Sequence, residues 1–454
     1  MSKSNPSRLM AEELIARILQ DGKLYFDGEY PYLRQDLFYE RVSDEAAKRY
    51  IVSLLNEAEK ISTPNSEYGE ALERLRLLDS LQLHLSDNLK NQQFLVNCQN
   101  GVFNAKTGRL EEDRGKSKFS FCCNFQYHPK SNIDQAPNFK RYLLTSVGEA
   151  NIPCFKACLG FLFSDIVEAK KAVFFVGDGN TGKSMVCDLI TDLVGKHAVC
   201  NEPFEKIGNE FSRHNFIGRK INISRETNKA VLKNESAFKS VVACENISGR
   251  RRYHDGVDFI SQLKLLVASN QPPEFSRVDE AILNRIVIIF FHSTLEEKDL
   301  DHDLRSKLYQ ERNIIGSLCL DALHRLVKSG YDFQMSAESK AYLNACRIKL
   351  HTVEEFLADR CEMAKGAAVS SVVLWDAYQK YCMDNGVEAL GRNNFYQQVL
   401  WCFPGVVHDK TNIGGRRLYA FIGMRFKPWE HMKSSGTDQK SEHLEPTENY
   451  SESV

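Results

Sequence analysis

The sequence predicts an α/β fold, in which a central parallel sheet lies between an N-terminal mixed α/β module and a C-terminal winged helix. Three observations support this. A glycine-rich motif at residues 177–184 stands between a strand pattern and a helix pattern. Apolar runs with strand character recur after the motif, separated by helical patterns, as is typical of a parallel sheet covered on both faces. The last part of the chain combines helical periodicity with a hairpin pattern.

The glycine-rich motif fits G-x-x-x-x-G-K-[ST], in which glycines let backbone N–H groups close around phosphates. The uncharged run 172–176 predicts a buried strand before it. Apolar residues at helical spacing from Val186 predict a helix after it, which Gly195 can end. We expect Lys183 to reach the phosphates of ATP and the Ser184 hydroxyl to ligate Mg²⁺. The predicted nucleotide-binding residues are Gly177, Asp178, Gly179, Asn180, Thr181, Gly182, Lys183 and Ser184.

Composition is that of an ordinary globular protein, with 43% hydrophobic and 26% charged residues. The formal net charge is −1, so any attraction to nucleic acid must come from local positive charge. No apolar run approaches the roughly 20 residues that span a bilayer, and the polar start does not resemble a signal peptide. Cys154 and Cys158 are expected to be buried thiols rather than zinc ligands, because no second ligand pair accompanies them. We expect a cytoplasmic protein with no membrane partner.

Residues 1–165 are predicted to form the mixed α/β module. Asp27-Gly28 between two apolar runs indicates a hairpin turn. The expected helices run from Leu9 to Leu19 and over 44–60, 67–90, 139–147 and 152–163, and the expected β segments cover 24–33, 93–103 and 119–127.

Residues 166–345 are predicted to form the sheet domain, with ligands at the carboxyl ends of its strands. Glu226 ends one apolar strand and is the predicted catalytic base or water-positioning carboxylate, and with Ser184 a magnesium ligand. Asn270 ends the next strand and can hydrogen-bond the γ-phosphate or the attacking water. Arg285 precedes the last strand and could neutralise transition-state charge in a neighbouring subunit. With Lys183, these three form the predicted catalytic set.

A second hairpin is predicted between Glu226 and Asn270. It carries cations for phosphates and an aromatic ring for stacking, which a grip on single-stranded DNA requires. The alternative is a solvated charged hairpin. The predicted DNA-binding residues are Lys239 on the preceding helix and, in the hairpin, Arg250, Arg251, Arg252, Tyr253 and His254.

The C-terminal part divides into two predicted segments. Residues 346–428 show three helical patterns and a hairpin with Gly414-Gly415 near its turn, which fits a winged helix and DNA binding. A small packing domain is the alternative. Residues 429–454 hold six carboxylates and two lysines, so we expect a disordered acidic tail.

The order of these motifs resembles that of a superfamily 3 helicase, and more narrowly the helicase part of the phage/plasmid and poxvirus-type primase–helicases. The glycine-rich loop, Glu226, the arginine hairpin, Asn270 and Arg285 carry the resemblance. The upstream segments Asn97-Cys98-Gln99-Asn100-Gly101-Val102-Phe103, Lys106-Thr107-Gly108 and Tyr127-His128-Pro129 are similar to the module that precedes the helicase in that family.

The resemblance implies an AAA+-like core and a ring, expected to be a hexamer, that moves 3′ to 5′ on single-stranded DNA. ATP would then bind between subunits with Arg285 acting in trans, and the arginine hairpins would line the pore. The chain departs from the family in having Ala243-Cys244-Glu245 where Gly-Gly-Asp is common. No primase domain is expected ahead of residue 1, so we do not expect primer synthesis.

The leading hypothesis is an ATP-dependent replicative DNA helicase of a phage, plasmid, genomic island or virus. Its expected partners are single-stranded and duplex DNA, further copies of the chain, and replication proteins of the host or element. An alternative is a DNA-binding initiator or scaffold in which ATP controls assembly only. A third hypothesis, a P-loop kinase, is disfavoured because the motifs after the loop supply arginines rather than an acceptor pocket.

Overall fold

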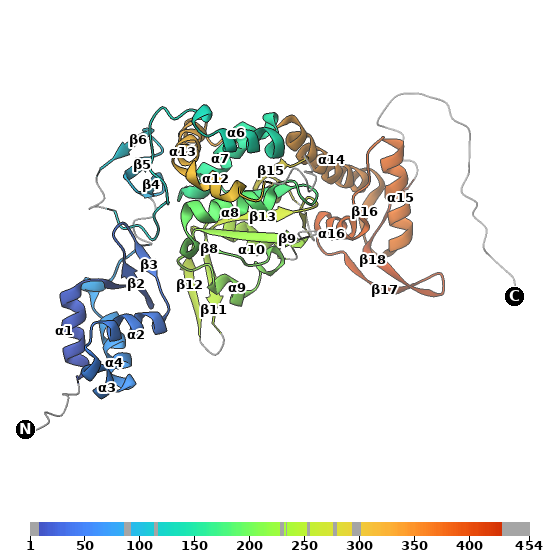
Figure 1. Ribbon diagram of the computed structural model, residues 1–454. Coiled ribbons are helices and arrows are strands. Elements are labelled where there is room, and N and C mark those ends of the chain that lie inside the picture. Colours follow the sequence, from blue (N-terminus) through green and yellow to red (C-terminus); the bar gives the residue numbers. More distant parts are fainter. Residues whose placement is uncertain are drawn as a thin grey trace, which may run out of the picture. The chain divides into compact units, whose positions relative to one another are not determined.

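The structure, a computed structural model, describes residues 9–85, 92–112, 117–227, 231–232, 234–251, 255–275, 279–292 and 301–428, apart from the side chains of 226–227, 231–232 and 274–275. The chain forms two compact units, Met1–Ala345 and Cys346–Val454 (Figure 1). The predicted acidic tail at 429–454 lies outside the described residues.

The first unit opens with a small lobe of helices and a three-stranded antiparallel sheet. The predicted hairpin is confirmed, because β1 and β2 pair as far as Asp27 and Tyr30, on either side of the turn at Gly28. The lobe has its own core, with Leu14 and Phe26 among its fully buried members. Its elements are α1 (Ala11–Asp21), β1 (Leu24–Asp27), β2 (Tyr30–Arg34), β3 (Tyr39–Arg41), α2 (Asp44–Ser53), α3 (Glu57–Ser62), α4 (Asn65–Arg76) and η1 (Asp79–Leu81).

The helix expected over 67–90 is shorter in the structure. It ends at Arg76, and the chain turns back so that Leu83 N donates to Phe26 O at 2.7 Å. Leu83 is fully buried. A continued helix would lose this hydrogen bond and carry Leu83 away from the strand, so tertiary packing overrides the helical pattern.

A second antiparallel sheet follows, but the strand predicted over 119–127 is wrong. This segment runs alongside β4 and is joined to it by an isolated bridge. Side-chain amides take up other backbone groups of the segment, since Asn97 Nδ2 donates to Phe121 O at 3.1 Å and Asn100 accepts from Tyr127 N at 2.9 Å. The strands of the sheet are β4 (Leu95–Cys98), β5 (Gly101–Asn104) and β6 (Arg109–Glu111).

The centre of the first unit is a five-stranded sheet in the order β15-β7-β13-β9-β8, with every pairing parallel. The predicted parallel sheet is confirmed, and it is consistent with a P-loop-like core. The AAA+-like assignment stays a prediction. The short strand β8 was not anticipated from the sequence. The strands are β7 (Ala172–Val176), β8 (Val199–Cys200), β9 (Ile221–Thr227), β13 (Lys264–Ser269) and β15 (Ile286–Phe290).

Helices cover both faces of this sheet. On one face Phe175 packs against Phe155 of α7, with 5.8 Å between ring centroids. On the other, Phe174 packs against Phe204, at 5.6 Å, and Phe204 packs against α10. The helices flanking the sheet are α6 (Pro137–Tyr142), the π-helical turn η3 (Leu143–Val147), η4 (Glu149–Asn151), α7 (Ile152–Phe163), α8 (Lys183–Val194), α9 (Glu210–His214), α10 (Glu235–Val242), α11 (Glu280–Leu283), α12 (Leu304–Gln310) and α13 (Arg312–Lys328).

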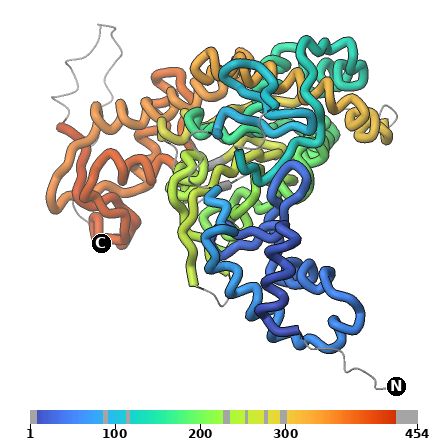
Figure 2. The backbone as a smooth tube through the Cα atoms, turned by 90° about the vertical axis from the view of Figure 1, so that its left-hand side faces the viewer, coloured from blue at the N-terminus to red at the C-terminus, as the bar shows by residue number. Residues whose placement is uncertain are grey.

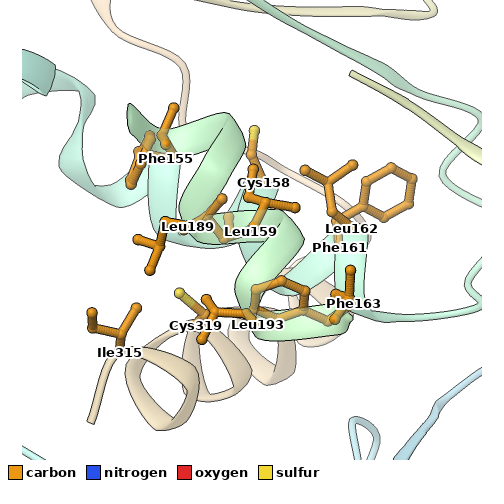
Figure 3. Packing of buried hydrophobic residues seen from close by; sticks show 14 of the residues in the cluster. Phe155, Cys158, Leu159, Phe161, Leu162, Phe163, Leu189, Leu193, Ile315 and Cys319 are labelled. Carbon is orange, nitrogen blue, oxygen red and sulfur yellow. The ribbon is translucent and has the colours of Figure 1, made fainter. Parts of the chain in front are cut away.

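Three helices form the core next to the sheet, and Figure 3 shows side chains from α7, α8 and α13 that meet there. The helices α7 and α13 approach closely at Gly160, where a Cβ atom would lie 2.3 Å from Cys319 O. A glycine is therefore required at the contact. No helix within the described ranges is both long and apolar enough to cross a membrane.

The second unit contains the helices and the hairpin predicted for 346–428. The turn at Gly414-Gly415 is confirmed by the pairing of Ile413 with Arg416. A strand that was not predicted, β16, completes an antiparallel sheet in the order β16-β18-β17. The winged-helix assignment and its DNA-binding role stay predictions. The elements are α14 (Ala337–Arg360, which begins in the first unit), β16 (Cys361–Ser370), α15 (Ser371–Asp384), α16 (Arg392–Cys402), β17 (Val407–Ile413) and β18 (Arg416–Phe426).

Candidate functional site

The glycine-rich motif forms a tight loop between β7 and α8. Gly177 packs against Phe291, whose carbonyl oxygen would lie 2.2 Å from a Cβ atom at this position. Gly182 has φ +92°, and a Cβ there would lie 2.8 Å from Ser146 Oγ. Tyr142 Oη donates to Gly182 O at 3.0 Å. The loop conformation thus depends on glycines and is supported from behind by α6 and η3.

Lys183 points back over this loop from the first turn of α8. Its ammonium donates to Gly177 O at 2.5 Å, Asp178 O at 2.6 Å and Thr181 Oγ1 at 3.1 Å. Lys183 is 9% exposed, and burial lowers its pKa. The first N–H groups of a helix have no intrahelical partners and carry the positive end of its dipole. The arrangement concentrates positive charge where an anion would bind.

A cavity of about 390 Å³ opens beside the loop, within the range typical of small-molecule sites. Its walls come from four parts of the first unit: the loop with α8, the helices before the loop, the carboxyl edge of the sheet, and the start of α12. The lining residues are Tyr142, Ser146, Gly179, Asn180, Thr181, Gly182, Lys183, Ser184, Met185, Cys187, Arg225, Ala268, Asn270, Asp301 and Leu304.

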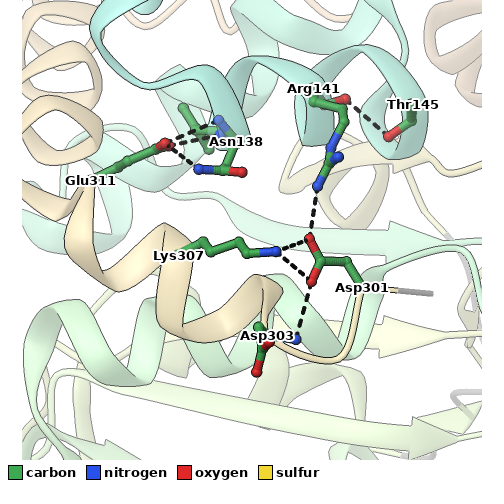
Figure 4. A network of polar contacts seen from close by, with 8 residues as sticks. Asn138, Arg141, Thr145, Asp301, Asp303, Lys307 and Glu311 are labelled. Atoms are coloured by element: carbon green, nitrogen blue, oxygen red, sulfur yellow. Dashed lines mark hydrogen bonds and ion pairs between the residues drawn. The ribbon is translucent and has the colours of Figure 1, made fainter. Parts of the chain in front are cut away.

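Asp301 is held at the cavity by a polar network (Figure 4). Its carboxylate accepts from Lys307 Nζ at 2.7 Å and Arg141 Nη2 at 2.8 Å, and chiefly the hydrogen bond from Lys307 lowers the pKa of Asp301. Glu311 accepts from Phe139 N at 2.9 Å in the first turn of α6. The network ties α6 to α12, and the two cations offset the charge of a carboxylate that would otherwise repel phosphates.

The residues predicted at the strand ends lie along one edge of the sheet. Asn270 directly follows β13 and lines the cavity together with Ser184. Glu226 lies in β9, next to β13, but its side chain is not among those described. The neighbouring Arg225 also lines the cavity, and its guanidinium forms an ion pair with Asp188 of α8 at 2.6 Å. The structure therefore places the loop, Asn270 and the backbone of Glu226 at the same carboxyl edge.

Two other predicted residues lie outside the cavity. Arg285 precedes β15 at the amino edge of the sheet, where its carbonyl accepts from Ala172 N at 2.8 Å and its Nη1 donates to Ala281 O at 2.7 Å. Lys239 of α10 forms an ion pair with Asp279, which caps α11. Neither residue lines the cavity of its own chain, and their assigned roles stay predictions.

The predicted arginine hairpin is formed by β11 (Asn246–Arg250) and β12 (Gly256–Ile260), which pair antiparallel (Figure 2). Arg250 and Arg251 are exposed at its end. Arg252, Tyr253 and His254 lie outside the described residues. Exposed cations at the tip are compatible with the predicted grip on DNA, which stays a prediction.

Several cavity residues were missed from the sequence. Tyr142 and Ser146 come from before the loop, and Asp301 and Leu304 come from after the sheet. None belongs to a spaced motif. Ser146 lies in the π-helical turn η3, a conformation frequent at functional sites. No periodicity in the sequence predicts this turn.

Three family models match parts of the chain. The model described as "D5 N terminal like" matches residues 10–148, and the model described as "Poxvirus D5 protein-like" matches residues 351–448. These matches support a D5-type primase–helicase family. Between the two D5-type segments, a family of unknown function, DUF5906, matches residues 175–285, which include the loop and Asn270.

Solved structures of the NrS-1 C-terminal region are also similar to this chain. The A form apo structure shares 11% sequence identity and covers 93% of this chain and 100% of that chain, with a TM-score of 0.45. The apo structure of residues 305–718 shares 10% identity and covers the same shares of both chains, with a TM-score of 0.44. Values this low do not establish a shared fold.

Proposed function

We propose that the protein is an ATP-dependent replicative DNA helicase that forms a ring and moves 3′ to 5′ on single-stranded DNA. One observation carries this proposal. The Lys183 ammonium is held over a loop whose conformation requires glycines, and Lys183 lines the same cavity as Asn270. The D5-type matches at both ends of the chain add support for a role in replication.

The residues at the carboxyl edge fit a nucleoside triphosphate with a magnesium ion. Lys183 and the N–H groups of α8 would bind the β- and γ-phosphates, and Ser184 with Glu226 would hold Mg²⁺, which would supply positive charge against the charge that develops on the phosphates. Glu226 would orient and deprotonate the attacking water, and Asn270 would donate a hydrogen bond to the γ-phosphate.

The position of Arg285 favours an intersubunit site. It precedes the five residues of β15 and lies at the opposite edge from the loop, so at 3.3 Å per residue it is roughly 17 Å away. Arg285 therefore cannot serve the nucleotide of its own subunit, but it can serve that of a neighbour across a head-to-tail interface. Such an interface generates a closed ring when its rotation closes, and a hexamer is the expected size.

The hairpin of β11 and β12 supplies the proposed contact with the translocating strand. Its exposed Arg250 and Arg251 would bind phosphates, together with Arg252, Tyr253, His254 and the more distant Lys239. In a ring these hairpins would face a common channel, and we expect ATP turnover to depend on DNA.

ATP hydrolysis by the full chain, with and without single-stranded DNA, tests this proposal. We expect DNA to raise turnover, Glu226→Gln to bind ATP but lose about a hundredfold or more in turnover, and Arg252→Ala to lose DNA stimulation. Turnover that DNA does not change, with ATP-dependent assembly, would instead favour the ATP-gated initiator. Absence of turnover in every condition would contradict the helicase.

A further inference from the structure

A pocket of about 260 Å³ opens where the start of α7 meets the end of α13, two helices that pack side by side (Figure 3). We name it the α7–α13 pocket. It shares no lining residue with the nucleotide cavity. It is smaller than most sites for whole drug-sized ligands, so it suits a single charged group. The polar residues in its lining are Lys156, Arg325, Ser329, Asp332 and Gln334.

Two cations line this pocket without a counter-charge. Lys156 of α7 is half-buried and Arg325 of α13 is exposed. Within the described ranges, neither side chain forms an ion pair or a hydrogen bond. The pKa of Lys156 is lowered chiefly by burial and further by Arg325, and no carboxylate of the described residues raises it. The two positive charges therefore repel each other within one pocket.

The ends of the two helices account for Arg325 but not for Lys156. Arg325 lies in the last turn of α13, where the helix dipole favours a cation. Lys156 lies in the second turn of α7, near the positive end, and the first turn of α7 contains no acid. The carbonyls of Arg325 and Leu326 already accept from Ser329 N and Tyr331 N, each at 2.9 Å. A partly buried cation without a partner costs free energy, which an anionic ligand would offset.

The segment that follows α13 brings an amide and an acid to the pocket. Phe333 anchors it, because its ring packs on that of Phe161 with 5.5 Å between centroids. Asp332 Oδ1 accepts from Gln334 N at 2.9 Å, and the Asp332 side chain is exposed and forms no ion pair with a residue that the structure describes. The Gln334 amide likewise has no hydrogen-bond partner among these residues, so its N–H groups can donate to a ligand.

The two cations favour a dianion over a singly charged group. A phosphate monoester carries about −1.5 to −2 charge at pH 7, whereas a carboxylate or a phosphodiester carries a single negative charge. A guanidinium bonds phosphate oxygens with its planar fork, and an ammonium bonds them as a point charge. One phosphate dianion could therefore neutralise Lys156 and Arg325 together, while Gln334 donates to a further oxygen.

We propose that the α7–α13 pocket binds a phosphate dianion through Lys156, Arg325 and Gln334. The site is separate from the glycine-rich loop, and its occupancy does not depend on ATP hydrolysis. The dianion can come from two sources that share this chemistry, which are free inorganic phosphate and the phosphorylated 5′ end of a DNA strand.

Equilibrium dialysis of labelled inorganic phosphate against the full chain tests the proposal. Every protein in the series carries Lys183→Ala, so that the glycine-rich loop contributes little to phosphate binding. We expect saturable binding that weakens about tenfold or more in Lys156→Met and in Arg325→Gln, because each substitution removes a charge-assisted hydrogen bond. Asp332→Asn should strengthen binding, because it removes a negative charge from the lining.

Lys328→Gln is the matched control. It removes a cation from the same last turn of α13, but Lys328 does not line the pocket, so phosphate affinity should stay nearly unchanged. Without phosphate, Lys156→Met should unfold at the same or a higher temperature than its parent, because it removes a partly buried, unpaired charge. Phosphate affinity that Lys156→Met and Arg325→Gln leave unchanged would overturn the proposal, as would an equal loss from Lys328→Gln.

A second titration separates the two sources. A labelled single strand with a 5′-phosphate and the same strand without it are bound to the same proteins. Tighter binding of the phosphorylated strand that Lys156→Met abolishes would identify a strand end as the ligand. Equal binding of the two strands, together with the loss of inorganic phosphate in Lys156→Met, would identify free phosphate. Absence of both effects would contradict the site.

Discussion

The two edges of the parallel sheet hold buried lysines in different surroundings. At the carboxyl edge Lys183 donates to loop carbonyls and faces a cavity. At the amino edge Lys220 pairs with Asp165, and Lys264 donates to the carbonyl of Ile166. The three residues are 9%, 4% and 3% exposed. Burial is thus similar, and the partners differ.

This difference separates a binding lysine from a structural one. At the edge of the cavity, the Lys183 ammonium can exchange its hydrogen bonds to loop carbonyls for bonds to an incoming phosphate, because the loop keeps its other contacts. Lys220 has no such exchange available, since losing it would leave the Asp165 carboxylate without its partner. A depressed pKa occurs at both edges, so the pKa alone does not identify the site.

The largest expected effect is a contrast between two alanine substitutions. Lys183→Ala should reduce ATP turnover by at least about a hundredfold, as expected for a lost electrostatic contact to the transition state, while the free energy of unfolding changes little. Lys220→Ala should instead lower that free energy by about 3 kcal/mol by breaking a buried pair. Steady-state turnover and denaturant unfolding of both variants check the contrast, and destabilisation by Lys183→Ala alone would reverse it.

A second expected effect is a pH dependence at the amino edge. Burial lowers the pKa of Lys264 to about 8, whereas an unfolded lysine titrates near 10.4. Between these values the folded state has lost the proton and the unfolded state keeps it, so this lysine makes the protein more stable as pH rises and less stable as pH falls through 8. From pH 7 to 10, the free energy of unfolding of wild type should rise by roughly 2–3 kcal/mol relative to that of Lys264→Met.

Unfolding of both proteins at pH 7 and pH 10 measures this gain. Comparing wild type with Lys264→Met removes the titrations that the two proteins share. A stability difference that is the same at both pH values would show that Lys264 keeps its proton in the folded state.

A smaller effect separates two glycines of the loop. Gly182→Ala places a Cβ at φ +92° and 2.8 Å from Ser146 Oγ. The substitution should lower the free energy of unfolding by about 1–3 kcal/mol and weaken ATP binding. Gly179→Ala is the control, because a Cβ there meets nothing within 4 Å. Thermal unfolding and ATP titration of the two variants test the pair. Equal effects would mean that the loop is not held against η3.

Local spacing was sufficient to predict the elements that carry the site. Patterns within a few residues predict the loop, the strand that ends before Asn270 and the strand that contains Glu226. They also predict the hairpins that turn at Gly28 and at Gly414-Gly415. What failed depended on distant contacts. The strand at 119–127 is absent because the amides of Asn97 and Asn100 take its backbone groups, and no pattern within the segment shows that.

The same limit applies to the cavity. In the sequence, Tyr142 comes before the first strand of the five-stranded sheet and Asp301 comes after the last. Both line the cavity because the polar network ties α6 to α12. Their proximity is a property of the packed fold. The residues that chemistry fixes at short spacing could be found from the sequence, whereas those that shape the cavity could not.

The most direct test is unwinding of a 3′-tailed duplex by wild type and Lys183→Ala in the presence of ATP and Mg²⁺, with a 5′-tailed duplex as the polarity control. We predict strand separation by wild type on the 3′-tailed substrate alone, and none by Lys183→Ala. ATP turnover by wild type without separation of either substrate would contradict the proposed helicase.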